Sequence, residues 1–182
     1  MKKVLFVVGS LREGSFNKQL AAMAEKALAG KAEVSYLDFT KLPLMNQDIE
    51  NPALPEVQAI RDEASAADAI WFFSPVYNFS IPGTIKNLID WLSRSIDPAN
   101  PAGESAIHNK FTTVSAAGAG GFENMFENYK FLLPFVRTQV IDEFTEVKIN
   151  DSAWVDGQLV LTDEAQAQFD AQVAAVIEAI NA

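Results

Sequence analysis

The chain has 182 residues, a formal net charge of −10 at pH 7 and a sequence pI near 4.5. This length suits one α/β domain with a substantial core, so residues 1–182 are expected to fold as a single domain. The acidic balance argues against a nucleic-acid partner, because such proteins concentrate Lys and Arg. No apolar stretch approaches the roughly 18 residues of a membrane span.

Cysteine is absent and histidine occurs once, at His108. These counts exclude disulfides, a thiolate nucleophile, Cys-ligated metals and a multi-histidine metal site. The cytoplasm is the default compartment for such a chain. His108 lies in a polar stretch without an evident partner, so we expect an ordinary surface residue.

The most informative stretch is GSLREGSFN, Gly9–Asn17. It follows the continuous apolar run Val4–Val8, which is typical of a parallel strand buried on both faces. After it, apolar residues recur at helical spacing, so a helix is expected to begin near Ser15 to Asn17. The members of that apolar stripe are Leu20, Met23, Ala24, Ala27 and Leu28.

This loop carries the polar residues Ser10, Arg12, Ser15 and Asn17. Hydroxyls, a guanidinium, an amide and free helix N–H groups together favour a dianion. The loop matches neither GxxxxGK[ST] nor GxGxxG, so the favoured ligand is a phosphate monoester. The alternative is that Ser and Asn only cap the helix while Arg12 is a solvated charge.

Further strands are expected at Glu33–Asp38 and Ala69–Ser74, and helices from Pro55 and from Pro82–Gly83. The apolar loop around Leu42, Leu44 and Met45 is expected to pack on the core. A second polar and aromatic loop, PVYNFSIPG, follows the strand that ends at Ser74. If the sheet order is 2-1-3-4-5, this loop and the first one are neighbours at the carboxyl edge, where open α/β sheets bind ligands.

The remaining chain supplies a strand at Lys110–Ala116 and then the glycine-rich loop Ala117–Gly121 at the same edge. The helix expected over Phe122–Val136 is apolar on more than one face, which indicates contact with a second subunit. A fifth strand is expected over Thr138–Ile149. A small hairpin is expected at Asp156–Gly157, followed by a helix capped by Thr162.

Taken together and in this order, four stretches resemble the NADPH-dependent FMN reductases, which include quinone, azo-dye and chromate reductases. They are GSLREGSFN, LPLMNQDIE (Leu42–Glu50), SPVYNFSIPGTIKNLIDWLSR (Ser74–Arg94) and SAAGAGG (Ser115–Gly121). The resemblance implies a flavodoxin-like three-layer sandwich around a five-stranded parallel sheet of order 2-1-3-4-5. It also implies FMN as cofactor and NADPH or NADH as co-substrate. The apolar helix Phe122–Val136 favours a homodimer, with a homotetramer as the alternative.

The same resemblance assigns binding roles to individual positions. The phosphate loop, the ring loop and the third loop of the family correspond here to Ser10, Arg12, Ser15, Phe16, Asn17, Pro75, Val76, Tyr77, Asn78, Ser115 and Gly118. Val76 stands where the family usually has a glutamate, which changes the subunit contacts or the surroundings of the ring. No catalytic side chain and no metal ligand are implied, because the flavin carries the chemistry.

The function expected from this resemblance is ping-pong hydride transfer from NAD(P)H to bound FMN, and then to a small-molecule acceptor. That acceptor is a quinone, an azo compound, a metal oxyanion or free flavin. One alternative is a flavodoxin-type electron carrier without its own NAD(P)H oxidation, against which Arg12 and the apolar Phe122–Val136 helix argue. A second is a binding or scaffold protein that has lost its flavin.

Overall fold

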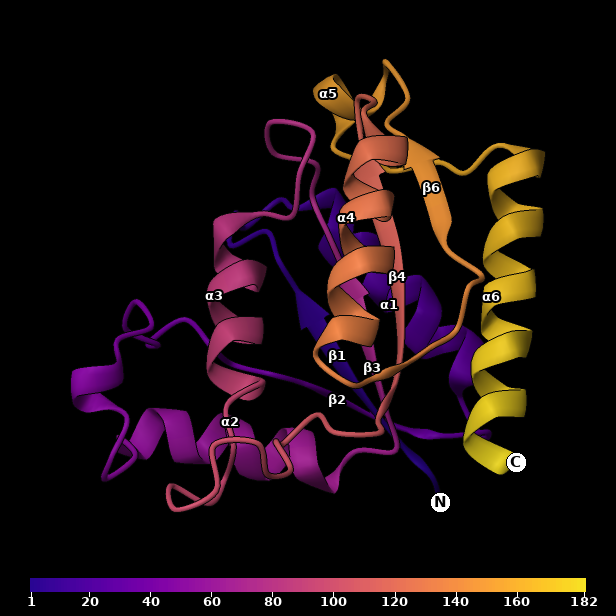
Figure 1. Ribbon diagram of the computed structural model, residues 1–182. Coiled ribbons are helices and arrows are strands. Elements are labelled where there is room, and N and C mark those ends of the chain that lie inside the picture. Colours follow the sequence, from indigo (N-terminus) through magenta and orange to yellow (C-terminus); the bar gives the residue numbers. More distant parts are fainter.

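A parallel β-sheet forms the middle layer of the computed structural model, which describes residues 1–182 (Figure 1). The strand order is β2-β1-β3-β4-β5, with β6 also paired to β4, and every pair is parallel. The expected α/β class and sheet order are therefore confirmed. The strands are β1 (Lys3–Val8), β2 (Glu33–Tyr36), β3 (Ala69–Phe73), β4 (Phe111–Gly118), β5 (Gln139–Val140) and β6 (Thr145–Lys148).

Helices cover both faces of this sheet and create two separate hydrophobic cores. Leu5 and Val7 of β1 belong to one core, and Val4 and Phe6 belong to the other. The unbroken apolar run of β1 is explained by this burial on both sides. One core is covered by α2 (Pro55–Ala66), α3 (Gly83–Leu92) and α4 (Phe122–Phe135), and the other by α1 (Phe16–Leu28) and α6 (Asp163–Asn181).

The loop between β2 and α2 packs on the first core, as expected, through Leu42 and Met45, whereas Leu44 is exposed. Asn87 of α3 fixes this loop by accepting from the Met45 N–H (2.8 Å) and donating to the Pro43 carbonyl (2.9 Å). The loop contains the short 3₁₀ helix η1 (Gln47–Ile49). No helix of the protein combines the length and the hydropathy that a bilayer-spanning segment needs.

The single fifth strand expected over Thr138–Ile149 is wrong in detail, because the structure has two short strands, β5 and β6, beside β4. Phe111 lies opposite Gln139, whereas Ser115 lies opposite Thr145. An advance of four residues along β4 thus corresponds to six residues along the segment of β5 and β6. The two extra residues bulge out between β5 and β6. The Thr113 hydroxyl donates to the Glu143 carbonyl (2.9 Å) and holds this bulge against β4.

The small hairpin expected at Asp156–Gly157 is also wrong. The segment forms the short helix α5 (Ala153–Asp156), and Gly157 ends it with φ 74°. The Gly157 N–H bonds to the Ala153 carbonyl (2.9 Å). A glycine in the left-handed region terminates helices as readily as it forms hairpin turns, so the Asp-Gly pair alone did not distinguish the two.

Candidate functional site

The three loops that follow β1, β3 and β4 meet at the carboxyl edge of the sheet, because these strands are parallel neighbours. Between them lies a pocket of about 250 Å³. Helix α5 lies at the same end of the molecule as the loop after β4 (Figure 1) and closes one side of the pocket. Its lining is Ser10, Arg12, Ser15, Phe16, Asn17, Pro75, Val76, Tyr77, Ala117, Gly118, Ala119, Ile149 and Trp154.

The first loop is held tightly at both of its ends. The Gly9 N–H bonds to the Phe73 carbonyl (2.9 Å), and the Thr84 hydroxyl donates to the Gly9 carbonyl (2.7 Å). A Cβ at Gly9 would lie 2.4 Å from Cδ1 of Ile85, so only glycine allows α3 to approach this closely. The loop is thus fixed to both β3 and α3 before any ligand binds.

Helix α1 begins where this loop ends, and its N-terminus points toward the pocket. Ser15 is the N-cap, with its hydroxyl accepting from the Lys18 N–H (3.4 Å), and the first turn carries no acidic residue. The positive end of the helix dipole is therefore not neutralised by the helix itself. Such an N-terminus attracts an anion.

Arg12 adds a full positive charge at this position. Its guanidinium lies over the Phe16 ring, 5.2 Å from the centroid, and it takes part in none of the ion pairs of the structure. The pocket lining contains no Asp or Glu, although the chain has 24 acidic and only 14 basic residues. This end of the pocket consequently fits a phosphate group.

The second loop lies on a buried hydrogen-bonded support. Tyr129 of α4 donates to the Ser74 hydroxyl (2.9 Å), directly before Pro75. Burial raises the pKa of Tyr129, so the phenol keeps its proton and remains the donor. Beyond Pro75, Tyr77 to Ser80 form a turn with positive φ at Asn78 (52°) and Phe79 (58°), and the Ser80 N–H bonds to the Tyr77 carbonyl (3.1 Å).

Nine of the eleven positions singled out from the sequence line this pocket, and Asn78 and Ser115 do not. Asn78 is exposed on the outer side of its turn. Ser115 is fully buried, where it accepts from the Trp71 indole N–H (2.9 Å) and donates to Gln172 of α6 (2.7 Å). The Ser115 side chain is therefore already committed to the core and does not reach the pocket.

Asn17 lines the pocket, but its side-chain amide is occupied. Its Nδ2 donates to the Ala117 carbonyl (3.0 Å) and its Oδ1 accepts from the Ala117 N–H (2.8 Å). This pair of bonds ties the start of α1 to the third loop, with Asn17 only 3% exposed. The side chain positions the two loops, which leaves the backbone of the helix N-terminus to face a ligand.

Four further residues line the pocket: Ala117 and Ala119, which belong to the third loop expected at this edge, and Ile149 and Trp154, which sequence reasoning missed. The last two come from the segment after β6, which is also a parallel strand whose carboxyl end lies at this edge. The rule that identified the other loops could have found them. His108 lies elsewhere, in a pocket with Lys2 and Asp68 at the amino end of the sheet.

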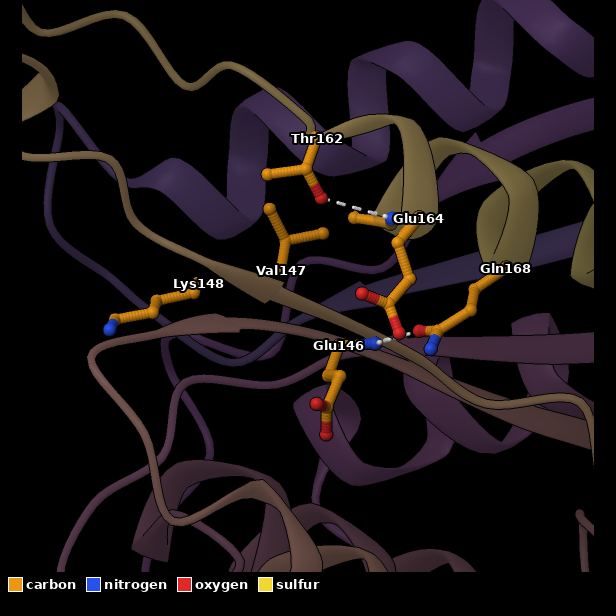
Figure 2. A pocket seen from close by; sticks show the side chains of 7 residues that line it. Glu146, Val147, Lys148, Thr162, Glu164 and Gln168 are labelled. Carbon is orange, nitrogen blue, oxygen red and sulfur yellow. Dashed lines mark hydrogen bonds between the residues drawn. The ribbon is translucent and has the colours of Figure 1, made fainter.

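Another pocket, of about 240 Å³, lies between β6 and the first turn of α6 (Figure 2). Its polar groups largely satisfy one another: the Thr162 hydroxyl accepts from the Ala165 N–H (3.2 Å), and Gln168 accepts from the Glu146 N–H (3.4 Å). Glu146 and Glu164 place two carboxylates there, against one cation, Lys148. This pocket is therefore unsuited to an anionic ligand.

The parallel sheet, its order and the pocket at its carboxyl edge define a flavodoxin-like α/β protein. The family model of the NADPH-dependent FMN reductases matches residues 2–147, which is most of the chain. The chain belongs to this family of oxidoreductases. FMN as cofactor and NAD(P)H as co-substrate are what that membership assigns to it.

Individual relatives agree with this membership. A quinone reductase of Pseudomonas putida is 40% identical over 123 residues, which cover 65% of this chain and 63% of the relative. An NAD(P)H:quinone oxidoreductase of Solanum tuberosum is 35% identical over 99% of this chain and 91% of its own length. The solved structure of FerB, a flavoenzyme NAD(P)H:(acceptor) oxidoreductase from Paracoccus denitrificans, superposes with a TM-score of 0.80 at 29% identity, covering 100% of this chain and 98% of FerB.

Proposed function

We propose that this protein is an NAD(P)H:quinone oxidoreductase that works by a ping-pong cycle on FMN held in the pocket at the carboxyl edge of the sheet. Bound FMN supplies the two-electron chemistry between the nicotinamide and the acceptor. Quinones are the favoured acceptors, because the relatives from Pseudomonas putida and Solanum tuberosum carry that activity in their names. Azo compounds, metal oxyanions and free flavin are further acceptors to test.

The observation that carries this proposal is the carboxylate-free phosphate end of the pocket. Ser10 and Ser15 offer hydroxyls, Arg12 offers an unpaired guanidinium, and the N-terminus of α1 offers backbone N–H groups. Charge-assisted hydrogen bonds of this kind are about twice as strong as neutral ones. These groups would anchor the phosphate, and Asn17 would keep the anchor in register with the third loop.

The other end of the pocket suits a flat ring. Pro75, Val76, Tyr77 and Gly118 line this end. A Cβ on Gly118 would lie 3.2 Å from Cγ2 of Val76, so glycine lets the loops after β3 and β4 pack closely here. Val76, in place of the usual glutamate, leaves this end without charge. Tyr77 is 51% exposed, which leaves an aromatic face at the mouth where a nicotinamide or quinone can approach.

The test is an anaerobic absorption experiment on purified protein that has been supplemented with FMN and desalted. One addition of NADPH or NADH should bleach the retained flavin, and a benzoquinone should then restore its absorbance. Steady-state double-reciprocal plots should give parallel lines, because the nicotinamide product leaves before the quinone binds. Retained flavin that neither nucleotide bleaches would identify an electron carrier instead.

The assembly proposed is a dimer that uses the outer face of α4. Phe131 and Phe135 on this helix are 76% and 75% exposed, and their rings stack with centroids 6.3 Å apart. Exposed aromatic pairs of this size are typical of protein contact sites. Light scattering should give a dimer mass, and the double change Phe131→Ser with Phe135→Ser should give a monomer. A monomeric wild type would refute this assembly.

A further inference from the structure

Trp154 is an exposed aromatic side chain at the rim of the pocket, in the segment after residue 147, where the match to the family model ends. It is 63% exposed, and its ring meets Phe16 edge-on, with centroids 5.3 Å apart. The Arg12 guanidinium also contacts Phe16, 5.2 Å from the ring centroid. Trp154 therefore lies at the phosphate end of the pocket, beside the N-terminus of α1.

The fold holds Trp154 at this place by several contacts that do not involve the indole. Gln19 of α1 donates to the Gly157 carbonyl (2.7 Å) and accepts from the Leu159 N–H (2.9 Å), which fastens the end of α5 to α1. The buried side chains of Ala153 and Leu159 anchor the segment in the core from both sides of Trp154. A large aromatic residue is thus kept in position although most of its surface is in water.

Exposed apolar residues on α5 are not all equivalent. Val155 is next in the chain and is 92% exposed, but it does not line the pocket. Only Trp154 combines exposure with a place in the pocket wall. Tryptophan is suited to such a rim, because its flat ring covers apolar surface while its N–H can still donate a hydrogen bond.

We propose that Trp154 is a further cofactor-binding residue, which covers the ribityl-phosphate end of FMN and slows its release. This inference rests on the proposed function. With the indole over the phosphate end, water is excluded from the bonds made by Arg12 and Ser15, and those bonds strengthen in the lower dielectric. The ring end remains open to nicotinamide and acceptor. The Trp154 indole therefore slows the release of FMN and leaves access to the FMN ring unchanged.

The experiment compares Trp154→Ala, Trp154→Phe and Val155→Ala in full-length protein. The FMN dissociation rate is measured by the recovery of flavin fluorescence after dilution. We expect Trp154→Ala to raise this rate about tenfold, Trp154→Phe to stay within threefold of wild type because an aromatic ring is retained, and Val155→Ala to leave the rate unchanged. Far-UV circular dichroism checks the fold of each variant.

Tryptophan emission gives a second readout that is independent of activity. The protein has three tryptophans, and Trp71 and Trp91 are fully buried. Acrylamide should therefore quench mainly Trp154 in the free protein. Saturation with FMN should protect this emission from acrylamide in the wild type. In Trp154→Phe, FMN should no longer change the quenching of tryptophan emission by acrylamide.

The possible failures are distinguishable. A wild type that binds no FMN refutes the proposed function and this inference with it. A wild type that binds FMN while Trp154→Ala and Val155→Ala release it equally fast refutes the role of Trp154 alone. The same holds if Trp154→Ala changes only the mass of the assembly, because the exposed indole would then serve a subunit contact.

Discussion

Helices α1 and α6 present their N-termini to pockets of nearly equal volume, about 250 and 240 Å³, yet only one of these pockets suits a phosphate. Both helices are capped by a hydroxyl, Ser15 in α1 and Thr162 in α6. The first turn of α1 has no acidic residue, whereas that of α6 carries Asp163 and Glu164, of which Figure 2 shows Glu164. The N-caps of α1 and α6 are alike, whereas the charged residues beside them have opposite signs.

This difference separates a structural cap from a binding site. In α6 the helix dipole is satisfied by carboxylates of the same helix, which stabilises the fold and repels an anion. In α1 no carboxylate of the first turn neutralises the dipole, and Arg12 adds a positive charge that is in no ion pair. In a protein with a net charge of −10, the pocket beside this helix end has no carboxylate in its lining.

The largest effect on FMN binding is expected from Ser15→Asp, which places a carboxylate at the N-terminus of α1. Aspartate is as good an N-cap as serine, so α1 should still form. Its carboxylate would occupy the place proposed for the phosphate, and the FMN dissociation constant should rise at least about 100-fold, or roughly 2.7 kcal/mol. Fluorescence titration with FMN and with riboflavin measures the effect. Riboflavin has no phosphate, so its affinity should fall much less than that of FMN. An equal loss of affinity for both ligands would indicate misfolding.

The next largest effect on FMN binding is expected from Arg12→Ala. Loss of a charge-assisted contact to phosphate should raise the FMN dissociation constant about 10- to 100-fold. The dependence on salt should also flatten, because the removed interaction is partly screened in the wild type. Lys26→Ala is the matched control, since it removes the same charge from the last turn of α1. Equal FMN affinity in the two variants would refute the phosphate site.

A smaller effect is expected from removing either cap. Ser15→Ala and Thr162→Ala should each lower the free energy of unfolding by about 1 kcal/mol, because each deletes one N-cap bond. Only Ser15→Ala should also weaken FMN binding, by several-fold. Denaturant unfolding and FMN titration of both variants measure the two effects separately. If Thr162→Ala weakened FMN binding as much, general destabilisation would explain both results.

The parts that could be predicted from sequence are those with local signals. The apolar run of β1 and the cap at Ser15 predicted a strand, a loop and a helix, and the structure has them there. The strand order came from the resemblance to the FMN reductases, and in an open parallel sheet ligands bind at the carboxyl edge. The sheet edge with its three loops followed from that order.

The parts that the sequence left undetermined depend on long-range partners. An amide such as Asn17 can bind a phosphate or bridge a backbone, and only the position of Ala117 on β4 decides between these roles. Ser115 lies inside β4, where alternation directs it to the α6 side, but its partner Gln172 lies far away in the sequence. The break between β5 and β6 has only a weak local marker, Asp142 and Glu143, because acidic residues are depleted in strands without being excluded from them.

The smallest effect is expected from the double change Asp163→Asn and Glu164→Gln, which makes the first turn of α6 neutral like that of α1. Two opposing contributions decide how this double change alters the free energy of unfolding. Loss of the carboxylates weakens the interaction with the helix dipole, worth about 0.3–1 kcal/mol per charge at low ionic strength. Removing two negative charges from a chain of −10 also relieves repulsion. The dipole term acts within one turn, so it should win by about 0.5 kcal/mol and lower Tm by about 1–2 °C. In 1 M NaCl the difference should shrink, because these charges are near the surface.

The pocket in Figure 2 should still bind no FMN, since Glu146 remains and no arginine faces it. A higher Tm would mean that relief of repulsion outweighs the dipole, and that charge alone, without the dipole, separates the two helix ends.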